Sequence, residues 1–272
     1  MNQSLFNLHN RSTWSLVVAT IVGIAAFLYP FVLPGIQQVT DDSTAHSGAA
    51  PLLFAAVVCV VLVVTLASLA GDAVGVERSR TVALLGVLVA IDATLRLVPS
   101  VAGASPVFLL IMLVGAVFGP VMGFQMGALT LLLSAFITGG IGPWLPFQIL
   151  ACGWVGMTAG MLPRHDSIRR RVIDLAIFGA VWGLLFGALM NLWFWPFTAP
   201  GVDVDSALYW QPDLSLQETL QRYGRFYLVT SLGFDAFRAI GNVVLVLLLG
   251  GPILKLLERY RSRFRWQPWE SA

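Results

Sequence analysis

Four charged residues lie inside long apolar segments and mark the places where this chain could do chemistry. Asp92 and Arg96 are four residues apart, and Asp235 and Arg238 are three apart, so each pair shares one face of a helix. If these segments cross a membrane, the charges are costly and must face a cavity or a partner. Two interpretations stay open: the pairs neutralise themselves or join two helices, or some of these groups line a pocket that opens outward.

Side-chain amides extend this polar pattern. Gln148 and Asn191 lie near the predicted outer ends of their apolar segments, so we expect them beside the same pocket. Gln125 and Asn242 lie deeper, where hydrogen bonds between packed helices are the expected role.

The elements that must position these groups are hydrophobic helices. Charged residues make up 11% of the 272 residues and hydrophobic residues 57%, whereas soluble domains contain about 25% charged residues. An apolar run of about 20 residues crosses the hydrocarbon of a bilayer as a helix. We therefore predict an all-α, polytopic membrane helical bundle with spans at residues 14–34, 51–71, 80–98, 105–119, 120–138, 144–162, 172–196 and 226–256. The fourth and fifth spans are short and meet at Gly119-Pro120, where a single bent hairpin is the alternative.

The distribution of arginine predicts the orientation, because cytoplasmic loops carry an excess of Lys and Arg. With both termini in the cytoplasm, the inner side receives Arg11, Arg78, Arg80, Arg164, Arg169, Arg170, Arg171, Lys255, Arg259, Arg261, Arg263 and Arg265. The outer side receives Asp41, Asp42, Asp203, Asp205, Asp213, Glu218, Arg222 and Arg225. The expected location is the cell membrane, with several spans and cytoplasmic N- and C-termini.

The longest connection joins the last two spans on the predicted outer side. Ser215 and Glu218 form a capping-box pattern, and Leu216, Leu220 and Tyr223 recur at helical spacing. This pattern predicts a short helix over the outer mouth. Aromatic residues flank it at Trp193, Trp195, Tyr209 and Trp210. They favour either an aromatic belt at the membrane interface or a lid whose rings face a ligand.

Small residues recur along three of the spans and allow helices to approach closely. Two stripes are expected to pack inside the bundle: Gly115, Gly119, Gly123 and Gly127, and Gly153, Gly156 and Gly160. The stripe Ala83, Gly86 and Ala90 on the third span is the candidate for docking another membrane protein.

Several chemistries are excluded because residue types are missing. The lone lysine, Lys255, lies in the tail, so the chain cannot supply a Walker lysine. His9, His46 and His165 all fall outside the spans, which removes intramembrane His–Ser dyads and His-based zinc sites. We therefore expect no catalytic residue, no metal and no cofactor, and no nucleic acid as a partner.

Motifs in residues 79–260 carry a family resemblance. They are Phe136-Ile-Thr-Gly-Gly-Ile-Gly-Pro-Trp-Leu-Pro-Phe-Gln-Ile-Leu-Ala151, Gly153-Trp-Val-Gly156, Gly160-Met-Leu-Pro163 and Thr230-Ser-Leu-Gly-Phe-Asp-Ala-Phe-Arg-Ala239. This part of the chain resembles the six-helix substrate-binding S component of energy-coupling factor (ECF) vitamin transporters, and the stripe Ala83, Gly86 and Ala90 is similar to that family's docking motif. The first two spans depart from the six-helix plan. We therefore divide the chain into an N-terminal transmembrane hairpin at 1–76 and a six-helix substrate-binding core with a basic cytoplasmic tail at 77–272.

The resemblance implies a substrate-specific component of an ATP-driven importer. The protein would be embedded in membrane lipid and capture a vitamin from outside. It would then dock on a T component with two ATP-binding subunits. The run around Trp144 is similar to S components assigned to cobalamin, so cobalamin or a related corrinoid is the expected substrate, while other vitamins or a queuosine precursor stay open. The expected substrate contacts are Asp92, Arg96, Trp144, Gln148, Asn191, Trp195, Trp210, Asp235 and Arg238, a few polar groups in a mostly apolar cavity.

Three other functions stay open. An integral membrane enzyme acting on a lipid could use Asp92 or Asp235 as a base, although no nucleophile–base arrangement accompanies them. A structural subunit without a ligand would use the ion pairs only to hold helices together. A stand-alone secondary transporter typically contains two related halves, and no such repeat occurs in this chain.

Overall fold

The computed structural model describes residues 11–40, 55–64, 76–101, 103–197, 207–211 and 214–263. The described part is built from α1 (Arg11–Thr40), α3 (Val76–Leu95), α4 (Val107–Phe118), α5 (Pro120–Thr138), α6 (Leu145–Ala159), α7 (Ile168–Leu192), the short 3-10 helix η1 (Trp195–Phe197), α8 (Leu216–Thr230) and α9 (Leu232–Arg263). A further apolar helix, Ala55–Val64, precedes α3. The predicted all-α membrane bundle is confirmed.

Helices occur in every predicted span, although their apolar character and their bounds differ from the prediction in several places. Three of the described helices, α5, α7 and α9, are long and apolar enough to cross a membrane, and shorter apolar helices occur at Thr13–Leu28, Ala55–Val64, Val107–Phe118 and Leu145–Ala159. The predicted span 226–256 is not one helix, because the chain leaves the helical conformation at Ser231, between α8 and α9. The predicted outer carboxylates Asp41, Asp42, Asp203, Asp205 and Asp213 lie outside the described residues, as do the side chains of Arg11, Arg78, Arg263 and Arg265.

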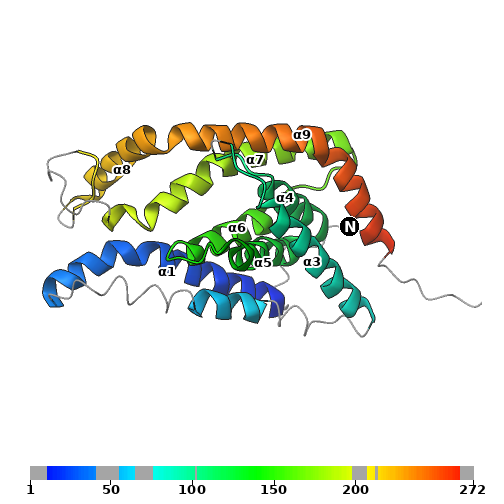
Figure 1. The fold of residues 1–272 in the computed structure, drawn as a ribbon, viewed down its shortest axis with the longest axis horizontal. Coiled ribbons are helices and arrows are strands. Elements are labelled where there is room, and N and C mark those ends of the chain that lie inside the picture. The colour runs from blue at the N-terminus through cyan, green and yellow to red at the C-terminus, as the bar shows by residue number, and fades with distance from the viewer. Residues whose placement is uncertain are drawn as a thin grey trace, which may run out of the picture.

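Two groups of helices enclose a central layer (Figure 1). The helices α7 and α9 pack side by side on one side of the molecule, and α1 lies on the opposite side. The central layer contains α4, α5 and α6, and α3 packs against α4 and α5. This arrangement brings the C-terminal ends of α3 and α5 together with the N-terminal turns of α4, α6 and α9 and the C-terminal half of α7.

Glycine sets the spacing of the central layer. A Cβ atom at Gly115 or Gly123 would overlap the carbonyl oxygen of Gly156, and one at Gly160 would overlap the backbone of Pro120. Gly119 adopts a φ of 99°, which favours glycine, and joins α4 to α5. The predicted internal packing role of these glycines is therefore confirmed, and α4 and α5 are separate helices that pack against each other.

We predict that Gly156→Ala destabilises the protein, because its methyl group would meet the backbone of Gly123. Overpacking of this kind costs about 1–3 kcal/mol, which thermal unfolding of the purified protein would measure. Gly86→Ala is the matched control, since a Cβ atom at Gly86 meets nothing within 4 Å. A Gly156→Ala protein as stable as Gly86→Ala would contradict the close backbone contact.

The N-terminus of α8 carries the predicted capping box. Glu218 N–H donates to Ser215 Oγ over 3.3 Å, and the Ser215 N–H donates to Glu218 Oε2 over 3.0 Å. The pKa of Glu218 is lowered because its carboxylate accepts hydrogen bonds from the side chain and backbone of Ser215. The cap therefore holds above the usual pKa of 4.5 and is lost as the pH falls through the lowered pKa.

Removal of this cap should loosen the start of α8 without unfolding the bundle. We expect Ser215→Ala to cost about 1 kcal/mol locally, which corresponds to roughly fivefold faster amide exchange at Glu218 and Thr219. Hydrogen exchange with mass spectrometry would measure this change at pH 7. The control is Ser262→Ala near the end of α9, which should leave α8 unchanged; equal exchange in Ser215→Ala and the wild type would show that the box does not stabilise this end.

Candidate functional site

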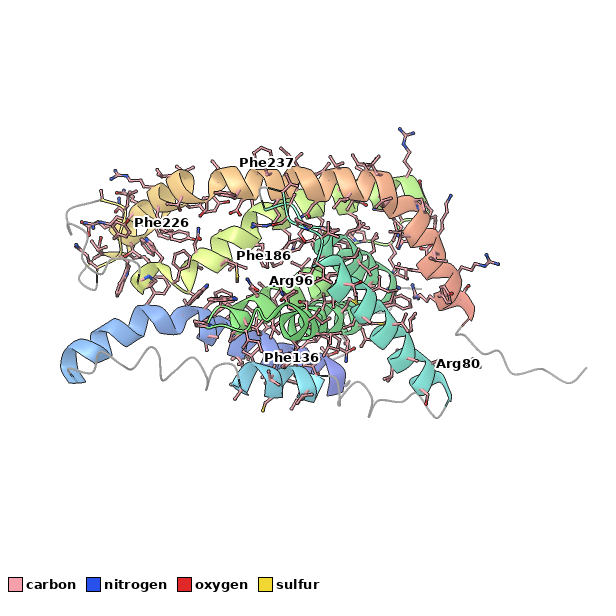
Figure 2. The ribbon with its side chains drawn as sticks, viewed as in Figure 1. Arg80, Arg96, Phe136, Phe186, Phe226 and Phe237 are labelled. Carbon is pink, nitrogen blue, oxygen red and sulfur yellow. The ribbon has the colours of Figure 1, made fainter. Side chains whose placement is uncertain are left out.

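A cavity of about 300 Å³ lies where the C-terminal end of α3 meets α4, α5, α6, α7 and α9. Its walls combine a few polar groups with a larger apolar surface. The lining residues are Arg96, Val98, Pro99, Ser100, Gly103, Ser105, Val107, Phe108, Leu131, Gln148, Cys152, Phe186 and Arg238. Figure 2 places Arg96 and Phe186 in the interior, whereas Arg80 lies at the other end of α3 and Phe237 on the outside of α9. This volume is at the lower end of the range for small-ligand sites, about 300–1,000 Å³.

Arg96 reaches from the end of α3 to two neighbouring helices. Its Nη1 donates to Ser134 Oγ on α5 over 2.8 Å, and its Nη2 donates to Gln148 Oε1 on α6 over 3.1 Å. Both acceptors are neutral, so these two hydrogen bonds do not pair Arg96 with a carboxylate. Ser134 was missed by the sequence prediction, although a serine inside the apolar run 120–138 is the signal that could have found it.

Arg238 is the second cation at the cavity, and it has a carboxylate partner. Its Nη1 donates to Asp235 Oδ1 one turn earlier on α9 and to the carbonyl oxygen of Gly183 on α7 over 3.2 Å. The guanidinium carbon also lies 5.3 Å from the centre of the Phe186 ring, within cation–π range. Asp235 is 2% exposed and lies behind the arginine, against Gly187, so it does not line the cavity.

The loop between α3 and α4 covers one side of the cavity and was not predicted as part of the site. Val98, Pro99, Ser100, Gly103 and Ser105 all line the cavity. Gly103 has a φ of 91°, and a Cβ atom there would come within 3.4 Å of Arg238 Nη2. By contrast, α8, the helix predicted over the outer mouth, contributes no residue to this cavity.

Asp92 and Arg96 do not form an ion pair within 4.0 Å, although they are four residues apart. The helix α3 ends at Leu95, so Arg96 lies in the following turn and its side chain extends toward α5 and α6. Asp92 is 0% exposed and lies beside the side chain of Thr130 on α5. Asp92 therefore belongs to the α3–α5 contact and not to the cavity wall.

The aromatic residues proposed as a lid pack against one another instead of facing this cavity. Trp195 is 1% exposed, donates from Nε1 to the carbonyl oxygen of Leu208 over 3.0 Å, and contacts the rings of Phe31 and Tyr223. Trp210 also contacts Phe31, at 5.9 Å between ring centres. These rings join α1 to η1 and α8. Trp144, the third tryptophan among the predicted contacts, directly precedes α6 and is 41% exposed.

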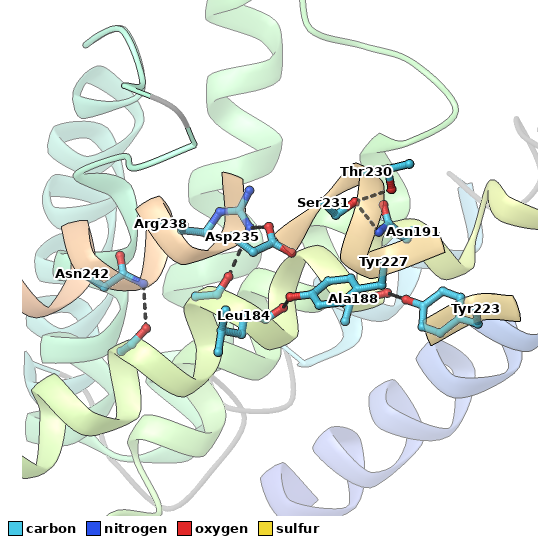
Figure 3. Close-up of polar contacts among 12 residues, drawn as sticks. Leu184, Ala188, Asn191, Tyr223, Tyr227, Thr230, Ser231, Asp235, Arg238 and Asn242 are labelled. Carbon is cyan, nitrogen blue, oxygen red and sulfur yellow. Dashed lines mark hydrogen bonds and ion pairs between the residues drawn. The ribbon is translucent and has the colours of Figure 1, made fainter. Parts of the chain in front are cut away.

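Polar contacts along α7 hold this helix to α8 and α9 (Figure 3). Asn191 Nδ2 donates to Ser231 Oγ over 2.7 Å, and Asn242 Nδ2 donates to the carbonyl oxygen of Gly179 over 2.9 Å. Tyr223 and Tyr227 donate to the carbonyl oxygens of Ala188 and Leu184. The helix-packing role expected for Asn242 is confirmed, and Asn191 is engaged in the same kind of contact.

Of the predicted contacts, Arg96, Gln148 and Arg238 line the cavity. The residues that do not line it are Asp92, Trp144, Asn191, Trp195, Trp210 and Asp235. It also contains residues that the sequence prediction missed. Phe108, Leu131, Cys152 and Phe186 are apolar residues of apolar spans, and their pattern does not distinguish a cavity wall from a packed core.

The stripe Ala83, Gly86 and Ala90 lies on an exposed face of α3. The opposite face of the helix is buried against α4 and α5 through Leu85, Leu88 and Val89. On the predicted inner side, Arg171 pairs with Glu258, and His165 lies 3.2 Å from Asp174. Within the described residues, no group of three or more His, Cys, Asp or Glu side chains could hold a metal ion.

Comparisons with known proteins point to one family. The family model for the ECF transporter, substrate-specific component, matches residues 80–250, which is well over half of the chain. No curated protein and no solved structure matches the chain.

The Asp235–Arg238 pair provides a test of how charge is held beside the cavity. Arg238→Leu leaves the buried Asp235 without a counterion, which should destabilise the protein by about 3–5 kcal/mol. The double variant Asp235→Leu/Arg238→Leu should recover most of this loss, because replacing both partners of a buried pair is often close to neutral. Thermal unfolding would compare both with Arg225→Leu, an exposed arginine on α8; equal stability of Arg238→Leu and Arg225→Leu would contradict the pairing.

Proposed function

The chain belongs to the family of ECF transporter substrate-specific components, and from this premise we propose that the cavity at the outer end of α3 captures a small molecule from outside the cell. A single observation carries the proposal: Arg96, Gln148 and Arg238 meet in an otherwise mostly apolar cavity of about 300 Å³. Few polar groups in an apolar cavity are the usual form of a small-ligand site. The family is one of transporter components and not of enzymes.

We also propose the assembly that would drive import. The exposed stripe Ala83, Gly86 and Ala90 docks on a T component, which two ATP-binding subunits drive. Small residues support this role because they let the backbone of a second membrane helix approach closely. The inner side carries the exposed cations Arg80, Arg169, Arg170, Lys255 and Arg259, which supports cytoplasmic termini under the positive-inside rule.

Cobalamin is the substrate expected from the resemblance around Trp144. A corrinoid with its axial base is larger than a cavity of about 300 Å³, so its capture would require the loop between α3 and α4 to move. The volume of the cavity favours a smaller vitamin.

One variant, Gly86→Leu, distinguishes docking on the T component from ligand capture. Gly86→Leu should abolish association with the T component and uptake into cells, because its side chain fills the face that a partner helix would approach. Ligand binding to the purified protein should stay within twofold of the wild type, since Gly86 lies outside the cavity. The protein would be co-expressed with the T component and ATP-binding subunits of its own genome, and copurification and uptake of a vitamin panel would be measured.

Gly233→Leu is the matched control for this experiment. Gly233 is also an exposed helical glycine with nothing near its Cβ position, but it lies at the start of α9. It should keep copurification and uptake. Normal uptake by Gly86→Leu would refute docking through the stripe, and uptake by the wild type without any ATP-binding subunit would favour a stand-alone transporter.

A further inference from the structure

The charge around the cavity constrains its ligand, if the proposed function is correct. Two guanidinium groups line the cavity, those of Arg96 and Arg238, and within the described residues no carboxylate does. Arg238 is paired with Asp235, whereas the polar contacts of Arg96 go to the neutral Ser134 and Gln148. The cavity wall therefore carries one cation, Arg96, that forms no ion pair within 4.0 Å among the described residues; the buried Asp92, one turn earlier on α3, lies against α5 and not in the wall.

The geometry of Arg96 favours a flat anionic group. Its hydrogen bonds to Ser134 and Gln148 use one N–H on each terminal nitrogen, out of five N–H donors in the guanidinium. These bonds also hold the plane of the group between α5 and α6. A fixed guanidinium matches a carboxylate through two parallel hydrogen bonds. Charge-assisted bonds of this kind are stronger where water is largely displaced.

The rest of the cavity would hold the uncharged part of the ligand. Val107, Phe108, Leu131 and Phe186 form apolar walls. The rings of Phe108 and Phe186 meet edge to face, with 5.0 Å between their centres. This surface suits an aliphatic or aromatic body, and the volume of about 300 Å³ limits its size.

The number of charges limits the ligand further. Asp92 lies against α5 beside Thr130 and does not enter the cavity wall. Among the described residues that line the cavity, Arg96 is the one cation without an ion-pair partner, and a single guanidinium fits a ligand with one negative charge. A phosphate monoester carries about −1.5 to −2 at pH 7, more than this wall balances. We infer that the ligand of this cavity is a small organic acid with one carboxylate, which Arg96 holds in a two-bond contact, and an apolar body against Phe108 and Phe186.

Matched pairs of acids and neutral analogues test this inference on the full-length protein in detergent. The pairs are nicotinate and nicotinamide, pantothenate and panthenol, and biotin and biotin amide, and cyanocobalamin is added as a large ligand that is not a small acid. Isothermal titration calorimetry measures each affinity. We expect at least one acid to bind at least tenfold more tightly than its neutral analogue.

Arg96 variants then assign the contact. Arg96→Gln should weaken binding of that acid by about 10- to 100-fold, the range for a lost hydrogen bond to a charged group, and should bring acid and neutral analogue close together. Arg96→Lys keeps the charge but not the planar pair of donors, so it should recover part of the affinity. Arg225→Gln, an exposed arginine on α8, is the control and should bind as the wild type does.

The outcomes separate this inference from the proposed function. Equal affinity for acid and neutral analogue, exclusive binding of cyanocobalamin, or an acid affinity unchanged in Arg96→Gln would overturn the organic-acid ligand and leave substrate capture intact. If no compound in the panel binds to a folded wild-type protein, both the ligand class and the capture role of this cavity are contradicted. The comparison of acid with neutral analogue in the wild type does not depend on the folding of any variant.

Discussion

An arginine in an apolar bundle must find hydrogen-bond acceptors, and this requirement organises the helix ends around the cavity. The guanidinium of Arg96 cannot lose its proton, so its charge is a fixed property of the chain. Ser134 on α5 and Gln148 on α6 accept its hydrogen bonds. These two hydrogen bonds join the C-terminal ends of α3 and α5 to the N-terminal part of α6. Neither acceptor carries a negative charge, so the cavity beside Arg96 is a place where an anionic group of a ligand could bind.

The two arginines at the cavity satisfy this requirement in different ways. Arg238 carries its counterion on the same helix and uses the face of Phe186 as a further partner. It is held in place whether or not the cavity is occupied. Arg96 has only neutral partners, so an anion in the cavity would complete its surroundings. The two Asp–Arg pairs have similar spacing in the sequence, but Arg238 pairs with its aspartate and Arg96 does not.

Sequence pattern was sufficient for the all-α class because apolar length is a local property, although it did not predict the break at Ser231 between α8 and α9. Apolar length predicted the helices, the Ser215–Glu218 pattern predicted the start of α8, and repeated glycines predicted the close packing around Gly156. The site was only partly predictable. Whether Arg96 turns toward Asp92 or away from it depends on where α3 ends and on acceptors 38 and 52 residues further along the chain, and no periodicity encodes such distant contacts.

The tryptophans show the same limit. Clustered aromatic residues near a membrane interface are compatible with a belt, a lid or a packed core. Trp195 and Trp210 are positioned by Phe31, a residue of α1 that is distant from them in sequence. Their role therefore depends on helices that lie outside the part of the chain that carries the family resemblance.

The packing of α1 also bears on how this subunit could sit in a larger complex. Gly23 lies against Trp154, and Phe27 contacts Phe147 and Trp154, so α1 covers one face of α6. That flank of the bundle is already occupied by the protein's own chain, whereas α3 presents its small residues on another flank. A neighbouring subunit could not pack directly on this part of α6, because α1 already covers it.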